Sequence, residues 1–430
     1  MPLETLQRDL LGIYRQTVCQ YVAVCKDTIR AELVSYMKRS FTGIGTRHIN
    51  ETLTLIAASI QVDNNVPMPC YLGAASELGT MRTYSKRRYT AVENGLVDVD
   101  AIVRGDGDTL RPHSPRWFST TCLPFEFDAD ATCPIWEGII TTNLNNDPEL
   151  IQIVQEFFGL CLVFDTDFQV FLFLFGNGGT GKSATLGALE ALLGSENVSN
   201  VPLERVGKDF ALIGMYGKLA NVVSEIGETD KVAESTLKSL VSGDMMEFQR
   251  KNLTSIFAQS TARMVFASNV LPKFRDKTDG LWRRMLIVPF NREVLESEKI
   301  RGLDKPEGWS DLGELSGMLN WSIDGLRRLR ENGRFTISEA SENLKSQYRK
   351  NCNPVQQFME EYVEDDASAW ISKNELYDAY SEFCGRSGYR PIPISDFNRE
   401  VPKHFPHVAG GDRKRIDGKR QYVWKGFRLT

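Results

Sequence analysis

The strongest apolar pattern in the chain is the unbroken run VFLFLF at residues 170–175. Such a run predicts a strand that is buried on both faces. Glycine then dominates residues 176–181, and good helix formers follow from Lys182 until Gly194. This order predicts a strand, a glycine-rich turn and a helix that ends at a glycine.

Three further segments, at residues 219–225, 263–269 and 285–290, are predominantly apolar and of strand length. Polar or helical segments separate them, and alternation of this kind is typical of an α/β domain. We therefore expect an α/β core over residues 166–300. A turn at Gly243-Asp244 and a projecting hairpin with its tip near residues 248–252 are expected between its second and third strands.

The first 165 residues have a weaker pattern. From Leu11 to Cys25 apolar residues recur at helical spacing, although β-branched residues leave a hairpin open, and residues 26–40 and 50–60 are helical in pattern. Turn signals predict an irregular β-rich segment over residues 61–130. Residues 136–162 are helical in pattern again. We expect a mixed α+β N-terminal domain at 1–130 and a helical collar segment at 131–165.

Beyond the core, residues 312–332 have a helical apolar face, within a segment at 301–350 that we expect to pack on the core. The tail at 351–430 is expected to be a separate domain. Ser372 and Glu375 form a capping box, Ser395 starts a second helix, and Asp417-Gly418 predicts a hairpin turn. Helices followed by a basic hairpin predict a winged-helix domain.

The charge balance changes this picture little. The 51 Lys and Arg residues against 56 Asp and Glu residues give a net charge of −5, which excludes a uniformly basic coat for nucleic acid. Any DNA contact must come from local patches. The eight cysteines are scattered and there are only four histidines, which favours reduced thiols in a cytoplasmic compartment over a zinc site or disulfide framework. We expect no signal peptide and no membrane span.

The glycine-rich turn has the composition of a phosphate-binding loop. Its glycines let successive backbone N–H groups point at phosphate oxygens, and the helix N-terminus adds its positive end. Lys182 is expected to reach the β- and γ-phosphates, and the Ser183 hydroxyl to bind Mg²⁺. We therefore expect a nucleotide site, with ATP and Mg²⁺ as cofactors, formed by Gly176, Asn177, Gly178, Gly179, Thr180, Gly181, Lys182, Ser183 and Ala184.

Two polar residues at strand ends are further candidates. Glu225 ends the second strand, which we expect next to the phosphate-loop strand, where the carboxylate could orient water and hold the Mg²⁺ shell. Glu228 is the second candidate for this role. The alternative is that Glu225 is an ordinary surface acid. Asn269 ends the third strand and could sense the γ-phosphate, or it could be an ordinary turn residue.

Cations provide the remaining candidates. Arg283 and Arg284 precede the last core strand. They could be surface charges, or one of them could be an arginine finger. In the tail hairpin, five cations flank one turn and are followed by Tyr422 and Trp424, so we expect DNA contact, with a solvated hairpin as the alternative. These five cations are Arg413, Lys414, Arg415, Lys419 and Arg420.

Taken in order, these motifs resemble those of superfamily 3 helicases. They are GNGGTGKS, the strand ending in Ser224-Glu225, LKSLVSGD with Arg250 and Lys251, the strand ending in Asn269, and LWRRMLIVPF. More narrowly, the chain resembles the primase-helicases of phages, plasmids and large DNA viruses, in the poxvirus-type and satellite-phage-type branch. The upstream pieces NGLVD (94–98), HSP (113–115), CPIW (133–136) and FFG (157–159) agree with that branch.

The resemblance implies an AAA+ P-loop ATPase core and a hexameric ring that translocates 3′ to 5′ on single-stranded DNA. It implies that Lys182, Glu225 and Asn269 are catalytic, with Ser183 and Glu225 at the metal. It also implies that Arg284, or else Arg283, is a finger reaching the neighbouring subunit's ATP, and that Lys251 with Arg250 grips DNA in the channel. Many members of the superfamily have two acids where this chain has Ser224 and Glu225, so Glu225 is expected to serve both metal and water.

We therefore expect an ATP-dependent DNA helicase that replicates a phage, plasmid or viral genome in the host cytoplasm or nucleoid. Its expected partners are single-stranded or forked DNA, copies of itself, and a primase or polymerase. Many relatives carry a polymerase-like primase domain upstream; we expect none in this sequence and therefore expect no primer synthesis from it. The alternatives are an ATP-switched replication initiator or loader, and an RNA-directed NTPase.

Overall fold

The computed structural model describes residues 11–15, 20–24, 26–59, 69–71, 88–114, 116–226, 233–251, 253–272, 274, 279–404, 409–416 and 418–430. The chain divides into two compact units. The first comprises Met1–Pro272 and Thr278–Glu342, and the second comprises Lys273–Lys277 and Asn343–Thr430.

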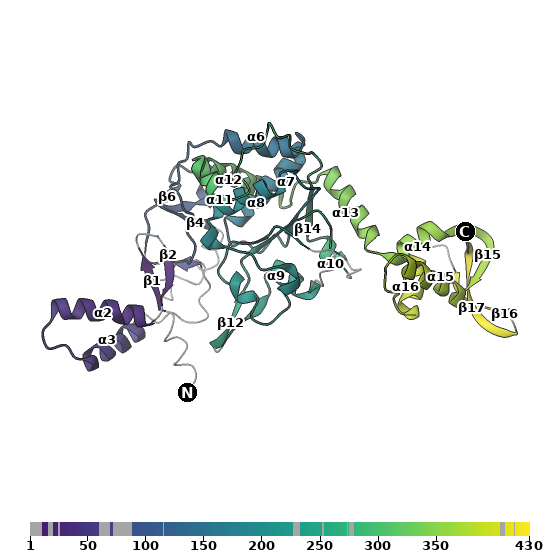
Figure 1. Ribbon diagram of the computed structural model, residues 1–430, viewed down its shortest axis with the longest axis horizontal. Helices are drawn as coiled ribbons and strands as arrows, with labels where there is room; N and C mark the ends of the chain where they lie inside the picture. The colour runs from purple at the N-terminus through teal and green to yellow at the C-terminus, as the bar shows by residue number, and fades with distance from the viewer. Residues whose placement is uncertain are drawn as a thin grey trace. The chain divides into compact units, whose positions relative to one another are not determined.

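A five-stranded sheet forms the centre of the first unit (Figure 1). Its strands are β8 (Phe171–Phe175), β9 (Val198–Ser199), β10 (Ala220–Val223), β13 (Arg263–Ser268) and β14 (Met285–Pro289), in the order β14-β8-β13-β10-β9. Every pairing is parallel, so all carboxyl ends meet at one edge. The apolar runs predicted as strands are confirmed, and their side chains are mostly buried.

One expectation about this sheet is wrong. The strand that leads to Glu225, β10, does not lie next to β8, because β13 pairs with both strands. Apolar patterning reports that a strand is buried but carries no information on its neighbours, and the long connection from β10 to β13 lets the chain return to the strand beside β8. Glu225 and Asn269 nevertheless follow strands that end at the same edge.

Helices surround the sheet, and Figure 1 shows α7, α8, α11 and α12 gathered on one side of it. The helices are α6 (Pro134–Asn143), α7 (Pro148–Cys161), α8 (Lys182–Leu193), α9 (Glu234–Ser242), α10 (Asp279–Trp282), α11 (Pro306–Asp311) and α12 (Leu315–Asn332). The short 3₁₀ turns are η1 (Ser195–Asn197), η2 (Leu203–Arg205) and η3 (Leu212–Met215). The predicted turn at Gly243 is confirmed, since this glycine ends α9 at φ +69°.

The hairpin predicted between the second and third strands is confirmed. It consists of β11 (Met245–Arg250) and β12 (Leu253–Gln259), paired antiparallel. Figure 1 shows β12 extending away from the five-stranded sheet. Lys251 lies at the tip of this hairpin.

The helical stretch predicted at 136–162 is two helices. Asn145 and Asn146 adopt φ values of 55° and 58° between them, a left-handed conformation that asparagine tolerates. The Asp147 carboxylate then caps α7 by accepting from the Glu149 and Leu150 N–H groups. The break turns the chain between α6 and α7, so each helix packs separately.

Helix α6 is fixed to the core at its N-terminus. The Ile135 and Trp136 N–H groups donate to the Glu314 carboxylate at 3.0 and 2.9 Å, where the helix dipole favours a negative charge. The buried Trp136 ring stacks on Phe158 at 5.4 Å and meets Trp309 and Trp321 edge-on. Gly317 of α12 admits the backbone of Thr132, because a Cβ there would lie 2.2 Å from it.

The N-terminal elements are short. They are β1 (Leu11–Arg15), β2 (Gln20–Val24), α2 (Lys26–Ser40), α3 (Thr46–Ser59), β3 (Cys70–Tyr71), β4 (Tyr89–Val92), β5 (Gly95–Asp98), α5 (Val99–Arg104), β6 (Leu110–Arg111) and β7 (Trp117–Phe118). The helical interpretation of residues 11–25 is wrong, and the hairpin alternative is right, because β1 and β2 pair antiparallel. Their β-branched residues favour the extended strand.

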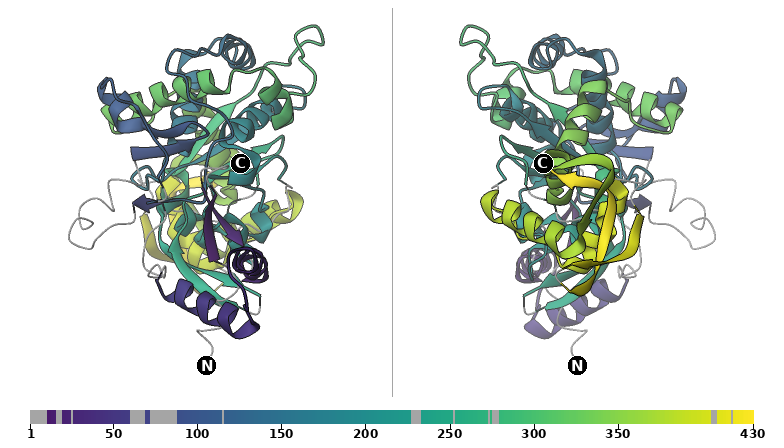
Figure 2. Two further views of the ribbon diagram at one scale, coloured as in Figure 1. Left: turned by 90° about the vertical axis from the view of Figure 1, so that its left-hand side faces the viewer. Right: turned by 90° about the vertical axis from the view of Figure 1, so that its right-hand side faces the viewer.

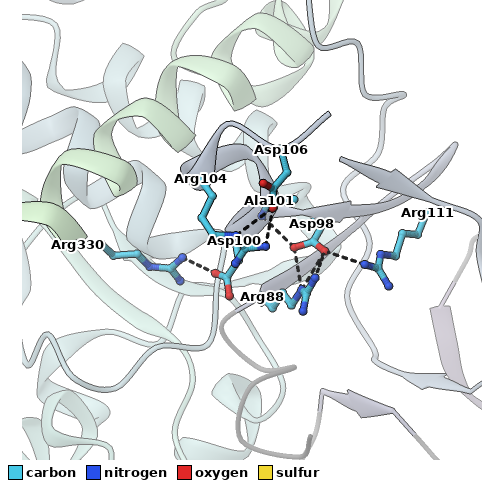
Figure 3. Close-up of polar contacts among 8 residues, drawn as sticks. All are labelled: Arg88, Asp98, Asp100, Ala101, Arg104, Asp106, Arg111 and Arg330. Atoms are coloured by element: carbon cyan, nitrogen blue, oxygen red, sulfur yellow. Dashed lines mark hydrogen bonds and ion pairs between the residues drawn. The ribbon is translucent and has the colours of Figure 1, made fainter. Parts of the chain in front are cut away.

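The Asp98 carboxylate contacts several neighbouring segments of the N-terminal region (Figure 3). Its fully buried carboxylate accepts from Arg88 at 2.6 and 2.9 Å and lies 3.3 Å from Arg111. It also caps α5 by accepting from the Ala101 N–H. Two residues on, Asp100 pairs with Arg330 of α12 at 2.7 Å. These ion pairs join β5 and α5 to both neighbouring strands and to the helical layer.

The second unit is built from helices and one sheet. Its elements are the end of α13 (Glu339–Asn351), α14 (Pro354–Tyr362), β15 (Val363–Ser372), α15 (Lys373–Arg386), α16 (Ile394–His404), β16 (Ala409–Ile416) and β17 (Lys419–Leu429). The right-hand view of Figure 2 shows the yellow strands beside the helices of the same unit. The predicted cap is confirmed, because Ser372 Oγ accepts from the Glu375 N–H at 3.0 Å. The hairpin β16–β17 is confirmed, with Asp417 of its turn outside the described residues.

No helix in the described part of the chain combines the length and the apolar character needed to cross a bilayer.

Candidate functional site

The glycine-rich turn connects β8 to α8 at the carboxyl edge of the sheet. Gly179 and Gly181 adopt φ values of 76° and 91°, which side-chain-bearing residues rarely adopt. A Cβ at Gly176 would lie 2.1 Å from the Phe290 carbonyl oxygen, and one at Gly181 would lie 2.2 Å from the Asn143 side-chain nitrogen. These positions therefore require glycine. Among the described residues no side chain caps the N-terminus of α8, so its first N–H groups are available to an anion.

Lys182 is the buried cation of this turn. Its ammonium donates to the Gly176 and Asn177 carbonyls, both at 2.6 Å, and to Thr180 Oγ1 at 3.4 Å. Burial lowers the pKa of the Lys182 ammonium. A charge that is desolvated but balanced only by carbonyl dipoles favours the approach of an anion such as a phosphate.

A cavity of about 1110 Å³ opens in front of the turn. Its lining includes Lys182, Ser183, Glu225 and Asn269, so the structure brings the predicted catalytic and metal residues together. The side chains of Ser183, Glu225 and Asn269 are exposed. Glu228, the reserve acid, lies outside the described residues.

The residues present suit a metal that a bound phosphate helps to hold. Among the described residues, no group of three or more His, Cys, Asp or Glu side chains could hold an ion alone. Mg²⁺ usually keeps several waters and takes one or two carboxylates together with substrate phosphates. Ser183 and Glu225, which line the same cavity, fit that requirement.

The two adjacent arginines differ in their surroundings. Arg284 is held within its own subunit, donating to the Gly280 carbonyl at 2.6 Å, Ser242 Oγ at 2.8 Å and Gln169 Oε1 at 3.0 Å. Burial lowers the pKa of Arg284. Arg283 is exposed and forms no hydrogen bond or ion pair with a described residue. Neither arginine lines the cavity.

The predicted DNA contacts lie on the two hairpins. Lys251 is exposed at the tip of β11–β12, and Arg250 is half-buried at the end of β11. In the second unit, the Arg413 guanidinium lies over the Tyr422 ring at 4.3 Å and the Lys414 ammonium over the Trp370 ring at 4.1 Å. Arg415 Nε donates to the Gly418 carbonyl at 3.3 Å, and Arg420 is exposed. The Lys419 side chain lies outside the described part of the structure.

A second set of residues lines the cavity, and the sequence did not predict it. They come from α6 and from residues 294–304, which follow the last core strand. The spacing of Ile135, Gly138, Ile139 and Thr142 places them on one face of α6, and this periodicity is visible in the sequence. Nothing in the sequence shows that this face points toward the phosphate-binding turn, because the two are separated by a helix and a strand.

Three protein families match separate parts of the chain. The family described as "D5 N terminal like" matches residues 22–144, and the "Poxvirus D5 protein-like" family matches residues 350–425. Between them, a family of unknown function (DUF5906) matches residues 174–284. The matches therefore cover much of the N-terminal part, the glycine-rich turn with β9, β10 and β13 of the sheet, and most of the second unit.

Two curated relatives are viral. The chain is 22% identical over 359 residues to "Putative helicase L207/L206" of Acanthamoeba polyphaga mimivirus, over 77% of this chain and 36% of that protein. It is 25% identical over 230 residues to "Putative helicase 121R" of Invertebrate iridescent virus 3, over 46% of this chain and 24% of that protein. The chain thus matches only about a third and a quarter of the length of these relatives.

A solved structure shares the fold. The apo A form of the NrS-1 C-terminal region superposes with a TM-score of 0.50 at 12% identity, covering 95% of this chain and 92% of that one. At this identity the likeness concerns the fold alone.

Proposed function

Because this chain is a member of the D5-type primase-helicase family, we propose that it is the ATP- and Mg²⁺-dependent motor of a viral or related replication helicase, acting on DNA. The observation that carries the proposal is the convergence of Lys182, Ser183, Glu225 and Asn269 on one cavity. These residues come from three different segments, and they meet because β8, β10 and β13 end at the same edge.

Each residue has a role that its surroundings suit. Lys182 neutralises phosphate charge, and the free N–H groups of the turn and of α8 hold phosphate oxygens. Ser183 and Glu225 take the metal shell. The exposed Glu225 carboxylate orients the attacking water, and the Asn269 amide binds the terminal phosphate. Bound Mg²⁺ would supply charge neutralisation between the phosphates.

We further propose that the active form is an AAA+ ring, with six subunits and 3′ to 5′ translocation carried over from the family. The parallel sheet with a hairpin inserted before β13 supports this architecture. Arg283 is the better placed of the two arginines to reach a neighbouring subunit, since its exposed guanidinium has no partner among the described residues and Arg284 is bound within its own subunit. The acidic net charge agrees with weak, local DNA contacts at Lys251 and at the β16–β17 hairpin, the wing of the proposed winged-helix domain.

Unwinding of a forked DNA duplex with Mg²⁺ and ATP tests the proposal. We expect the wild-type chain to unwind it and Glu225→Gln to bind ATP but not unwind, because a neutral amide cannot accept a proton from water. Glu331→Gln, which removes an exposed acid on α12, is the matched control and should behave as wild type. Replication activity retained by Glu225→Gln would favour the initiator or loader, and stimulation by RNA alone would favour the RNA-directed NTPase.

A further inference from the structure

The cavity in front of the glycine-rich turn is larger than its phosphate end requires. Its volume of about 1110 Å³ is at the upper end of the range of about 300 to 1,000 Å³ found for pockets that hold a whole small molecule, so it has room for more than phosphate groups. The turn, Glu225 and Asn269 account for only part of the lining. Apart from residues next to Glu225 and Asn269 at the ends of β10 and β13, the rest of the lining is α6 and the segment 294–304, which we term the strap.

The α6 wall is apolar and open. Ile135, Gly138, Ile139 and Thr142 follow the i, i+3, i+4, i+7 spacing of a single helix face, and all line the cavity. Ile135 remains 38% exposed despite its size. Gly138 has no heavy atom within 4 Å of the position that a Cβ would take. A flat group can therefore approach the α6 backbone at this glycine.

The strap supplies a second wall and is anchored at both ends. The Val294 N–H donates to the Gly179 carbonyl of the glycine-rich turn at 3.0 Å, and the Trp309 indole N–H donates to the Leu303 carbonyl at 2.8 Å. Between these anchors, Glu298 accepts from the Leu295 N–H and from Arg292 at 2.6 Å. Ile300 lines the cavity and is 48% exposed.

Two large aliphatic side chains, Ile135 and Ile300, are thus left exposed toward one cavity by two fixed segments. Exposed apolar surface of this kind marks a ligand-binding groove when polar groups border it. Here the bordering groups are those of the phosphate-binding end and charged residues of the strap, among them Glu296, Lys299 and Arg301. The apolar part therefore suits the non-phosphate part of the same ligand.

Asn143 adds a polar group between the phosphate-binding end of the cavity and its apolar part. Its side chain is 3% exposed, lines the cavity, and forms no hydrogen bond with any described residue. It packs directly against Gly181. A buried amide without a partner is costly, so a ligand that supplies hydrogen bonds there is favoured.

We propose that α6 and the strap form the nucleobase site of the bound nucleoside triphosphate. Ile135, Ile139 and Ile300 pack on the base, Gly138 leaves room for its plane, and the Asn143 amide hydrogen-bonds the nucleoside. The inference rests on the proposed function for its phosphate end. It implies that α6, within the region matched by the "D5 N terminal like" family, belongs to the nucleotide site.

A comparison of two probes tests this site, namely ATP and inorganic triphosphate, each titrated with Mg²⁺. Gly138→Val fills the space for the base and should weaken ATP binding by about 30-fold or more, while leaving triphosphate binding within about threefold. Gly385→Val is the matched control, because Gly385 is also helical and also open. It should change neither affinity.

Ile300→Ser is the second variant, since an exposed side chain of the strap can be changed without disturbing the core. It should weaken ATP binding by about three- to tenfold and leave triphosphate binding unchanged. Wild-type ATP affinity in both variants, or an equal loss for both probes, would overturn the nucleobase site while the phosphate site stands. A wild-type chain that binds neither probe would overturn the proposed function as well.

Discussion

Two carboxylates of the first unit, Asp98 and Glu225, come at or just after the end of an apolar strand, and their surroundings differ. Asp98 ends β5 fully buried, with two arginines and a helix N-terminus around it (Figure 3). Glu225 follows β10 exposed, with no hydrogen bond or ion pair to a described residue, and lines the large cavity. In the sequence the two patterns look alike, so the groups that surround each carboxylate in the fold decide its role.

The difference in surroundings distinguishes a carboxylate that stabilises the fold from one that can take part in the reaction. A buried carboxylate whose partners are all protein groups stabilises the fold, and removing it leaves charges unpaired. An exposed carboxylate beside a phosphate-binding turn is available to water, metal and ligand. The adjacent arginines show the same contrast, since Arg284 is bound within its subunit and Arg283 has no hydrogen-bond or ion-pair partner among the described residues.

The largest expected effect concerns these arginines. Arg283→Ala should lower ATP turnover by about 10³-fold without changing the melting temperature, because an arginine finger neutralises transition-state charge. Arg284→Ala, which loses three hydrogen bonds within the subunit, should instead lower the melting temperature. Steady-state hydrolysis and thermal denaturation of both variants measure the two effects.

Mixing two inactive variants tests whether the finger acts on a neighbouring subunit. Arg283→Ala protein combined with Glu225→Gln protein should regain hydrolysis, since a mixed ring can pair an intact acid with an intact finger. Equal loss of turnover and of stability in both arginine variants would contradict the distinction between the free and the bound arginine.

The second prediction concerns Lys251, which is exposed and, among the described residues, unpaired. If six subunits each place one Lys251 on a phosphate, Lys251→Ala should lower the slope of log affinity against log salt by about 4, at about 0.7 per contact on single strands. Titration of single-stranded DNA at several salt concentrations measures this slope.

Arg104→Ala is the control for this titration, because Arg104 is exposed but paired with Asp106 at 2.9 Å. The same change of charge should leave the salt slope unaltered there. A slope that falls equally in both variants would mean that net charge, and not a hairpin contact, governs DNA affinity.

Stability gives the third test. Asp98→Asn should lower the free energy of unfolding by about 2 to 3 kcal/mol, because Arg88 and Arg111 lose their buried anion; their partial exposure keeps the loss below that of a fully buried pair. Glu225→Gln should change it by less than about 0.5 kcal/mol. Denaturant unfolding compares the two, and a larger loss for Glu225→Gln would reverse the roles assigned here.

The smallest effect is expected at the link between α5 and α12. Asp100 and Arg330 are 23% and 19% exposed, so Asp100→Asn should cost about 1 kcal/mol, a factor of about 5 in the unfolding equilibrium. The same unfolding assay detects it, and ATP turnover should not change. Loss of turnover with unchanged stability would place Asp100 in the chemistry instead.

The sequence predicted the core well because its signals are local. The apolar run before Gly176 and the helix from Lys182 follow from burial and glycine chemistry, and β8 and α8 begin within a residue of the predicted positions. Strand order was mispredicted, since pairing of β13 between β8 and β10 depends on contacts distant in sequence. β15 was missed because its acidic residues 364–366 resemble a loop, and pairing with β17 makes them a strand.

The candidate site was predicted only in part for the same reason. The phosphate-binding end consists of residues, such as Lys182 and Glu225, whose type and position in a motif already indicate their chemical role. Ile135, Gly138 and Asn143 are ordinary residues of a helix, and only the fold brings that helix to the glycine-rich turn.

The steady-state rate of ATP hydrolysis with and without single-stranded DNA, with Lys182→Ala as the blank, tests the proposed DNA-coupled motor directly. We predict Mg²⁺-dependent hydrolysis that DNA stimulates strongly and that Lys182→Ala abolishes, because that ammonium is the buried charge of the phosphate-binding turn. Hydrolysis that persists in Lys182→Ala, or that DNA leaves unchanged, would contradict a DNA-coupled motor at this site.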